Sequence, residues 1–132
     1  MITVIKSPFV QYKLTILRNK KTSNTVFRQT MNEISYLIAS DVLQYVPFKK
    51  QSIQTPLKKM SGTVLGQPII LVPILRAGLG LLEGFAKFLP EAEKGHIGLY
   101  RDEQTYEPVE YLFKLPRVKN KKVLILDPML AT

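Results

Sequence analysis

Four charged residues stand directly after apolar runs that predict buried strands: Arg76, Arg101, Asp102 and Asp127. The carboxyl ends of parallel strands meet at one edge of a sheet, so we expect these side chains to face a common crevice. Arginine suits phosphate because its planar guanidinium donates paired hydrogen bonds and keeps its charge. Aspartate suits sugar hydroxyls because a carboxylate accepts two O–H donors. The pattern predicts a site for a phosphorylated sugar.

Individual members of this set have simpler explanations that stay open. Arg101 and Asp102 are also consistent with a surface loop in which each pairs with a neighbouring charge, and Asp102 with Glu103 fits a solvated loop better than a metal site. His96, the only histidine, begins an apolar run, which favours a structural role. Arg76 is the most informative, because the Ala-Gly-Leu-Gly after it would place bare backbone and a helix start beside an anion.

The elements that would position these residues form an open α/β sheet. Residues 68–75, PIILVPIL, are apolar on both faces, as in a parallel strand covered by helices on each side. A turn at 76–80, a helix from 81 to 89 and a strand from 96 to 100 complete a βαβ unit. Two further predicted strands are 111–115 and 123–126.

Two helices and a hairpin are predicted ahead of this sheet. Residues 24–46 form an amphipathic helix ended by Pro47, with apolar residues at steps of three and four: Phe27, Met31, Ile34, Ile38, Val42 and Tyr45. Residues 9–17 predict a shorter helix, and residues 50–65 an irregular hairpin. We therefore expect one domain in three parts: N-terminal helices (1–48), an irregular β-hairpin (49–66) and the parallel-sheet core (67–132).

The composition is that of a one-domain globular protein. The chain has 132 residues, of which 45% are hydrophobic and 22% charged. No apolar run approaches the roughly 18 residues that span a bilayer, and the first residues lack the pattern of a secretory signal. Without cysteine, disulfides and thiolate catalysis are excluded, and a cytoplasmic location is expected.

The net charge of +9 is concentrated in the first 60 residues. That part carries ten lysines and arginines against two acids, whereas the rest carries nine against eight. Such a segment is consistent with nucleic acid or an acidic membrane surface. We favour an ordinary solvated surface, because the basic residues occur singly or in pairs. Moreover, Phe27 and Tyr45 are expected on the buried stripe and not displayed for bases.

Four segments resemble the uracil phosphoribosyltransferase family, in its order and at its spacing. They are VPILRAGLG (72–80), GHIGLYRD (95–102), EPVEYLFKLP (107–116) and LILDPMLAT (124–132). The resemblance extends over the entire chain, and Pro128 after Asp127 is characteristic of the uracil branch. It implies a type I phosphoribosyltransferase fold. The implied reaction, part of pyrimidine salvage, joins uracil and 5-phosphoribosyl 1-diphosphate (PRPP) to give UMP and diphosphate.

The same resemblance implies roles for the strand-end residues. Arg76 and Arg101 match contacts to PRPP, and Asp127 matches the aspartate that holds the ribose hydroxyls, so these three are the expected catalytic residues. The phosphoribose-binding loop is expected to begin with Asp127, Pro128, Met129, Leu130, Ala131 and Thr132. The expected cofactor is Mg²⁺ bound with the diphosphate, without a separate metal site on the protein. A homo-oligomer is expected, and GTP is left open as an allosteric effector.

The resemblance further implies that the chain is the N-terminal part of such a domain. In the family the loop continues with Gly-Gly-Ser, and a later segment recognises the base; neither is present in this sequence. We therefore expect a truncated domain without UMP formation of its own. Two other hypotheses remain: a non-catalytic binding or dimerisation module built on the helices and hairpin, and, less favoured, an RNA-binding regulator on the same fold.

Overall fold

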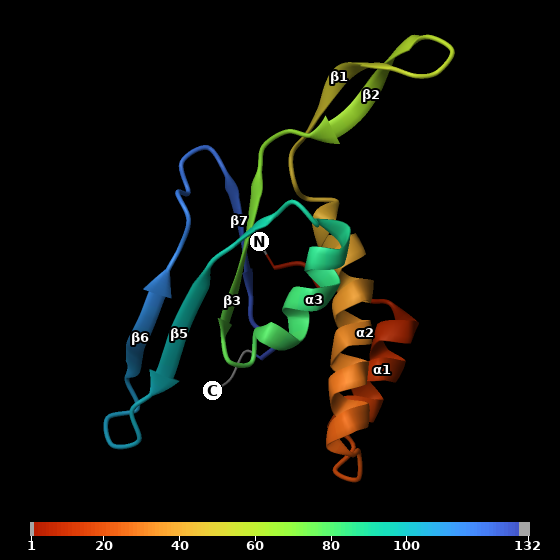
Figure 1. Ribbon diagram of the computed structural model, residues 1–132. Coiled ribbons are helices and arrows are strands. Elements are labelled where there is room, and N and C mark those ends of the chain that lie inside the picture. The colour runs from red at the N-terminus through yellow and green to blue at the C-terminus, as the bar shows by residue number, and fades with distance from the viewer. Residues whose placement is uncertain (1, 130–132) are drawn as a thin grey trace.

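The computed structural model describes residues 2–129 and contains a sheet, helices packed on one of its faces, and an arm of two strands that projects from it (Figure 1). The helices are α1 (Pro8–Arg18), α2 (Asn24–Leu43) and α3 (Leu79–Phe88). The strands are β1 (Phe48–Gln54), β2 (Lys59–Leu65), β3 (Ile69–Leu75), β4 (Glu93–Lys94), β5 (His96–Arg101), β6 (Pro108–Lys114) and β7 (Lys122–Leu126). Within the described part, no helix is long and apolar enough to cross a membrane.

Strand β3 lies at the centre of the sheet. Ile70 pairs with both Glu93 and Val123, so β4 and β7 lie on opposite sides of β3, and both run parallel to it. Strand β5 continues the line of β4 in the same register and is also parallel to β3, which confirms the predicted βαβ unit. Helix α3 begins two residues earlier than predicted.

Strand β6 departs from the expected parallel sheet, because it runs antiparallel to β5. The reason is the short connection between them, residues 102–107. A connection of this length joins antiparallel neighbours, whereas a parallel crossover needs a dozen residues or more. The sheet is therefore mixed, with parallel strands where the predicted site residues stand.

Helix α2 packs on α3, and its predicted stripe is confirmed only in the middle. Ile34 is buried, and Met31, Ile38 and Val42 contact the core. The two ends of the stripe were predicted wrongly, since Phe27 is 42% and Tyr45 64% exposed. Tyr45 lies beyond the end of the helix at Leu43, and Phe27 lines an open cavity at the start of α3. The burial of these aromatics therefore gives no argument against nucleic-acid binding.

Helix α1 is confirmed, with Pro8 in its first turn. The Ser7 hydroxyl caps it by accepting from the Val10 amide at 3.5 Å. Lys13 then ties it to α2 through an ion pair with Glu33 at 2.7 Å. Hydrogen bonds from Lys13 and then Gln29 hold the pKa of Glu33 below its ordinary value.

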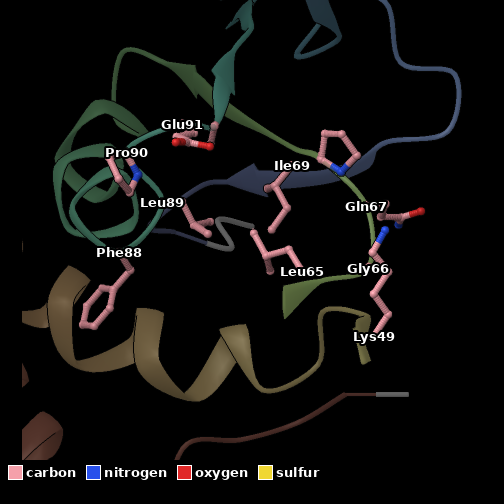
Figure 2. A pocket seen from close by; sticks show the side chains of 11 residues that line it. Lys49, Leu65, Gly66, Gln67, Ile69, Phe88, Leu89, Pro90 and Glu91 are labelled. Atoms are coloured by element: carbon pink, nitrogen blue, oxygen red, sulfur yellow. The ribbon is translucent and has the colours of Figure 1, made fainter. Parts of the chain in front are cut away.

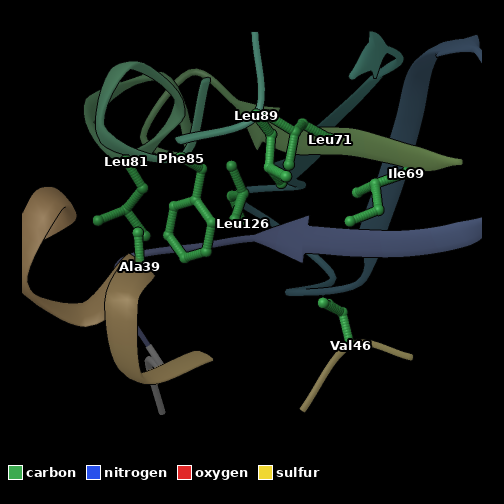
Figure 3. Close-up of a cluster of buried hydrophobic side chains, with 8 residues drawn as sticks. All are labelled: Ala39, Val46, Ile69, Leu71, Leu81, Phe85, Leu89 and Leu126. Atoms are coloured by element: carbon green, nitrogen blue, oxygen red, sulfur yellow. The ribbon is translucent and has the colours of Figure 1, made fainter. Parts of the chain in front are cut away.

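The core lies between the sheet and helices α2 and α3. Figure 3 shows the Phe85 ring of α3 between Leu126 of β7 and Leu81 of α3, with Leu81 above Ala39 of α2. Side chains alternate between the faces of a strand, so Ile69 and Leu71 face this cluster while Ile70 and Val72 face away. All four are nearly inaccessible, which confirms that β3 is buried on both faces.

The second face of the sheet has a different cover from the one predicted. Within residues 2–129 no helix packs there; instead the Leu115 side chain, at the start of the connection from β6 to β7, lies against it. An ideal Cβ at Gly95, beside Val72, would overlap the Leu115 side chain, so this connection lies directly on the backbone. The cover is partial, since Phe113 and Ile125 on the same face remain 60% and 64% exposed.

The arm formed by β1 and β2 confirms the predicted hairpin but is regular. Its seven residue pairs run unbroken from Phe48 opposite Leu65 to Gln54 opposite Lys59. A tight turn closes it, with the Thr55 amide donating to the Lys58 carbonyl at 3.0 Å. Neither strand packs against another described helix or strand, and Figure 1 shows the arm projecting from the body.

Candidate functional site

Arg76 and Asp127 directly follow β3 and β7, and Arg101 is the last residue of β5, so all three lie at the same edge of the sheet, as predicted. Extending the β3–β7 register by one residue places Asp127 level with Ile74, two residues before Arg76. Neighbouring strands are about 4.8 Å apart and rise about 3.3 Å per residue, so the backbones of Asp127 and Arg76 lie within about 8 Å. The structure therefore brings these two residues together.

Arg101 lies farther out than the other two. Ile97 is level with Ile74, so Arg101 stands four residues beyond that row, about 13 Å at the usual rise per residue. It is the last residue of β5, at the base of the hairpin that extends past the end of β3 (Figure 1). Arg101 shares the edge but would reach a ligand from the opposite side to Asp127.

The turn after β3 was expected to offer free backbone amides to an anion at the start of a helix, and the structure differs on this point. The amides of Leu79, Gly80 and Leu81 donate to the carbonyls of the residues three positions earlier, at 3.1–3.2 Å. The first-turn amides are therefore already engaged, and no side chain caps the helix. The exposed guanidinium of Arg76 is the group that this turn offers to an anion.

The carboxylate of Asp127 is exposed at the end of β7. Its Oδ1 accepts a bond of 3.4 Å from the Met129 amide, which orients the group and leaves acceptor capacity toward the edge. Pro128 and Met129 continue the predicted phosphoribose loop. The remaining residues assigned to that loop, Leu130, Ala131 and Thr132, lie outside the described residues.

Asp102 has a structural role in the loop after β5. Its Oδ1 accepts from the Thr105 amide at 2.8 Å, the Gln104 amide at 2.9 Å and the Thr105 hydroxyl at 3.2 Å. These bonds, led by the Thr105 amide, hold the pKa of Asp102 below its ordinary value. This agrees with the prediction of a solvated loop. The Asp102 carboxylate is used by the loop itself, so the structure does not support a metal site shared by Asp102 and Glu103.

We expect this loop to open at low pH. A lowered pKa in the folded state means that the carboxylate stabilises the loop above its unfolded pKa and loses this effect as pH falls through the folded value. In an amide NMR titration, the Gln104 and Thr105 resonances should move together with a midpoint below the ordinary aspartate value. Asp102→Asn should abolish that transition, and Glu103→Gln should leave it unchanged. A midpoint at or above the ordinary value would contradict the assignment.

Two cavities lie at opposite ends of β3. One, of about 620 Å³, lies beside the candidate site between α2, the start of α3 and the residues that follow Asp127. The other, of about 490 Å³, lies at the amino end of β3 beside Ile69, with Lys49, Gln67 and Glu91 on its rim (Figure 2). Since Arg76 follows the carboxyl end of β3, the cavity in Figure 2 is not part of the candidate site.

The described residues contain no cluster of three or more His, Cys, Asp or Glu that could hold a metal. Mg²⁺ commonly binds through one or two carboxylates together with substrate phosphates. Asp127 has an exposed carboxylate at this edge, whereas that of Asp102 is engaged by its loop. This arrangement fits a magnesium ion that arrives with a diphosphate. His96, at the amino end of β5, lies away from the edge.

Sequence reasoning missed an aromatic pair beside Arg101. The rings of Tyr100 and Tyr111 lie 6.2 Å apart, and both side chains are 53% exposed. A β-bulge between Gly98 and Leu99 breaks the alternation that would have placed them on opposite faces. Gly98 is the residue of the sequence that could have indicated this pair, because a glycine is needed where an ideal Cβ would come within 2.5 Å of the Tyr111 ring.

Comparison with known proteins gives one consistent result. The family model described as uracil phosphoribosyltransferase matches residues 4–132. Curated relatives with that name, from Lactiplantibacillus plantarum and Streptococcus thermophilus, are each 47% identical over 131 residues, which is 98% of this chain and 63% of the relative. The AQ2163 protein from Aquifex aeolicus has a similar solved structure, with a TM-score of 0.91, 35% identity, and coverage of 100% of this chain and 64% of that one. The chain thus spans somewhat less than two thirds of the length of these proteins.

Proposed function

The chain belongs to the uracil phosphoribosyltransferase family, and from this we propose that it provides the PRPP-binding part of an enzyme that converts uracil and PRPP to UMP and diphosphate. The observation that carries the proposal is the proximity of Arg76 and Asp127 at the carboxyl edge of the sheet. One offers a permanent cation suited to phosphate, and the other an acceptor suited to ribose hydroxyls. The type I phosphoribosyltransferase fold supports the same proposal.

In the proposed mechanism, the anomeric carbon of ribose gains cationic character while negative charge builds on the departing diphosphate. Arg76, and Arg101 from the far side, stabilise that negative charge electrostatically. Asp127 accepts hydrogen bonds from the ribose hydroxyls and orients the sugar for displacement. We expect the hairpin after Arg101 to cover the substrate and exclude water.

We also propose that Mg²⁺ joins this site with the substrate. It would be held by oxygens of the diphosphate and by Asp127, and it would neutralise charge on the leaving group. Uracil recognition, GTP as an effector and a cytoplasmic location remain predictions for the whole protein.

The test separates binding from turnover. The chain should bind PRPP in calorimetry with Mg²⁺ present and should form no detectable UMP. A chimera that joins it to the part of the L. plantarum relative outside the match should form UMP. A chain that binds no PRPP, together with an inactive chimera, would contradict the proposed function. UMP formation by the chain alone would mean that the base site lies within residues 1–132.

A second role, dimerisation through the arm, is favoured by the arm's lack of contacts. An isolated two-stranded hairpin is marginally stable in water, so an arm that packs on nothing else needs a partner. Ile53 and Met60 are paired on one face and are 39% and 46% exposed, whereas Ser52 and Ser61 are paired on the other. We propose that the face carrying Ile53 and Met60 meets a second copy of the chain, which is the homo-oligomer predicted above.

We expect Ile53→Asp with Met60→Asp to shift the chain from dimer toward monomer, because four like charges would then meet at the two-fold contact. Sedimentation velocity over a range of concentrations measures the shift, with a dissociation constant raised at least about tenfold. Ser52→Asp with Ser61→Asp adds the same charge to the opposite face and should leave the dimer intact. Equal effects of the two pairs, or a monomeric unaltered chain, would contradict this role.

A further inference from the structure

Gly78 is the buried residue of an otherwise exposed turn. Arg76 and Ala77 before it are exposed, and Leu79 after it is 46% exposed, whereas Gly78 itself is buried. Its amide donates to the carbonyl of Ile74 at 2.7 Å, which folds the turn back on the end of β3. The turn is therefore anchored at this one position.

The site leaves no room for a side chain at Gly78. An ideal Cβ there would overlap the carbonyl oxygen of Leu126 and would lie 2.6 Å from the nitrogen and 2.7 Å from the oxygen of Ile74. All three are backbone atoms, so none can move away by changing a rotamer. The φ of −60° is available to any residue, and glycine is therefore required here for close approach and not for backbone freedom.

This contact joins the two halves of the candidate site. Leu126 is the residue before Asp127, and Arg76 stands two residues before Gly78. We propose that Gly78 is a positioning residue whose contact with Leu126 fixes the separation between Arg76 and Asp127. The proposal rests on the proposed function, because that separation would match the distance between the diphosphate and the ribose of PRPP.

Two other glycines of the same segment provide matched controls. An ideal Cβ at Gly80 would lie 2.9 Å from Cγ of Met31, a flexible side chain that can adjust. At Gly84 it would overlap the Ser35 hydroxyl and lie 2.5 Å from the Ser35 carbonyl carbon, so the crowding is similar to that at Gly78. Gly84, however, lies where α3 packs closely against α2, and it does not touch either loop of the site.

The test compares a whole substrate with its two parts. A ligand that engages two groups at once gains affinity only if their separation matches its own. With Mg²⁺ present, Gly78→Ala should bind diphosphate and ribose 5-phosphate within about threefold of the unaltered chain but PRPP at least about tenfold more weakly. Gly80→Ala should bind all three normally. Gly84→Ala should lower the melting temperature and keep the PRPP affinity of its folded fraction.

Two further measurements keep the proposal testable if Gly78→Ala does not fold, and they distinguish its failure from failure of the proposed function. Inserting one glycine between Arg76 and Ala77 leaves Gly78 seated while displacing Arg76, and it should give the same selective loss for PRPP. Without any ligand, the Asp127 amide resonance should shift in Gly78→Ala and not in Gly84→Ala. Unchanged PRPP affinity in Gly78→Ala or the insertion variant, equal losses for all three ligands, or an unshifted Asp127 resonance would overturn the positioning role. Absence of PRPP binding by the unaltered chain, with that resonance still shifting, would overturn the proposed function alone.

Discussion

Arg76→Ala should lower the rate of UMP formation by the chimera about a hundredfold while the fold is retained. Removing one preorganised donor to charge that develops in a transition state raises the barrier by about 3 kcal/mol. Arg76 is exposed at the carboxyl edge and its backbone lies near that of Asp127, so in the proposed mechanism its guanidinium would face the departing diphosphate. Steady-state kinetics with varied PRPP and saturating uracil measure the effect. Most of the loss should fall on kcat, because the charge on the leaving group is greatest in the transition state.

The matched control for Arg76 is Arg117. It is also exposed, but it lies in the connection that enters the amino end of β7, at the opposite edge of the sheet. Arg117→Ala removes the same charge from the chain and should leave kcat within about twofold, because surface substitutions away from the site have small effects. Wild-type kinetics for Arg76→Ala would remove Arg76 from the mechanism. Equal losses for both variants would point to net charge and not to a site.

The sequence predicts the central elements well because their patterns depend on a single physical requirement. Burial on both faces demands an uninterrupted apolar run, and residues 69–75 meet that demand, so β3 is confirmed. Helix α1 is confirmed because Ser7 and Pro8 are strong start signals. The strand ends then place Arg76 and Asp127 on one edge without further information, since parallel strands share their direction.

The remainder depends on register and on neighbouring elements, which local patterns do not contain. The distance of Arg101 from Asp127 follows from the pairing of Ile74 with Ile97, and no residue type reveals that pairing. The stripe of α2 was extended too far, because the periodicity does not show that α3 fails to cover Phe27. The sequence predicts Gly78 only as bare backbone within Ala-Gly-Leu-Gly, because its close approach to Leu126 depends on a residue far away in the sequence.

Phe85→Ala is expected to destabilise the chain by about 3–5 kcal/mol, the range for deleting a buried phenylalanine. Phe85 is 2% exposed and lies at the centre of the core, between Leu81 and Leu126 (Figure 3). The loss of stability has two parts: the transfer free energy of the buried ring, which is no longer gained, and the cost of the cavity that remains. Native proteins of this kind are stable by about 5–15 kcal/mol, so the substitution removes a large share of the total stability.

The effect should also reach the candidate site, because α3 leads directly from the Arg76 turn. Urea denaturation measures the free energy of unfolding, and Phe88→Ala, three residues along the same helix, is the control. Phe88 is 51% exposed, so its truncation should cost no more than about 1 kcal/mol. At a urea concentration that unfolds part of the Phe85→Ala population, PRPP binding should fall in proportion to the folded fraction, because the fold that brings the Arg76 turn and Asp127 together includes the packing of α3 on β3 and β7. Equal stability losses for the two variants, or PRPP binding that persists after the helix signal is lost, would contradict this account of how the core supports the site.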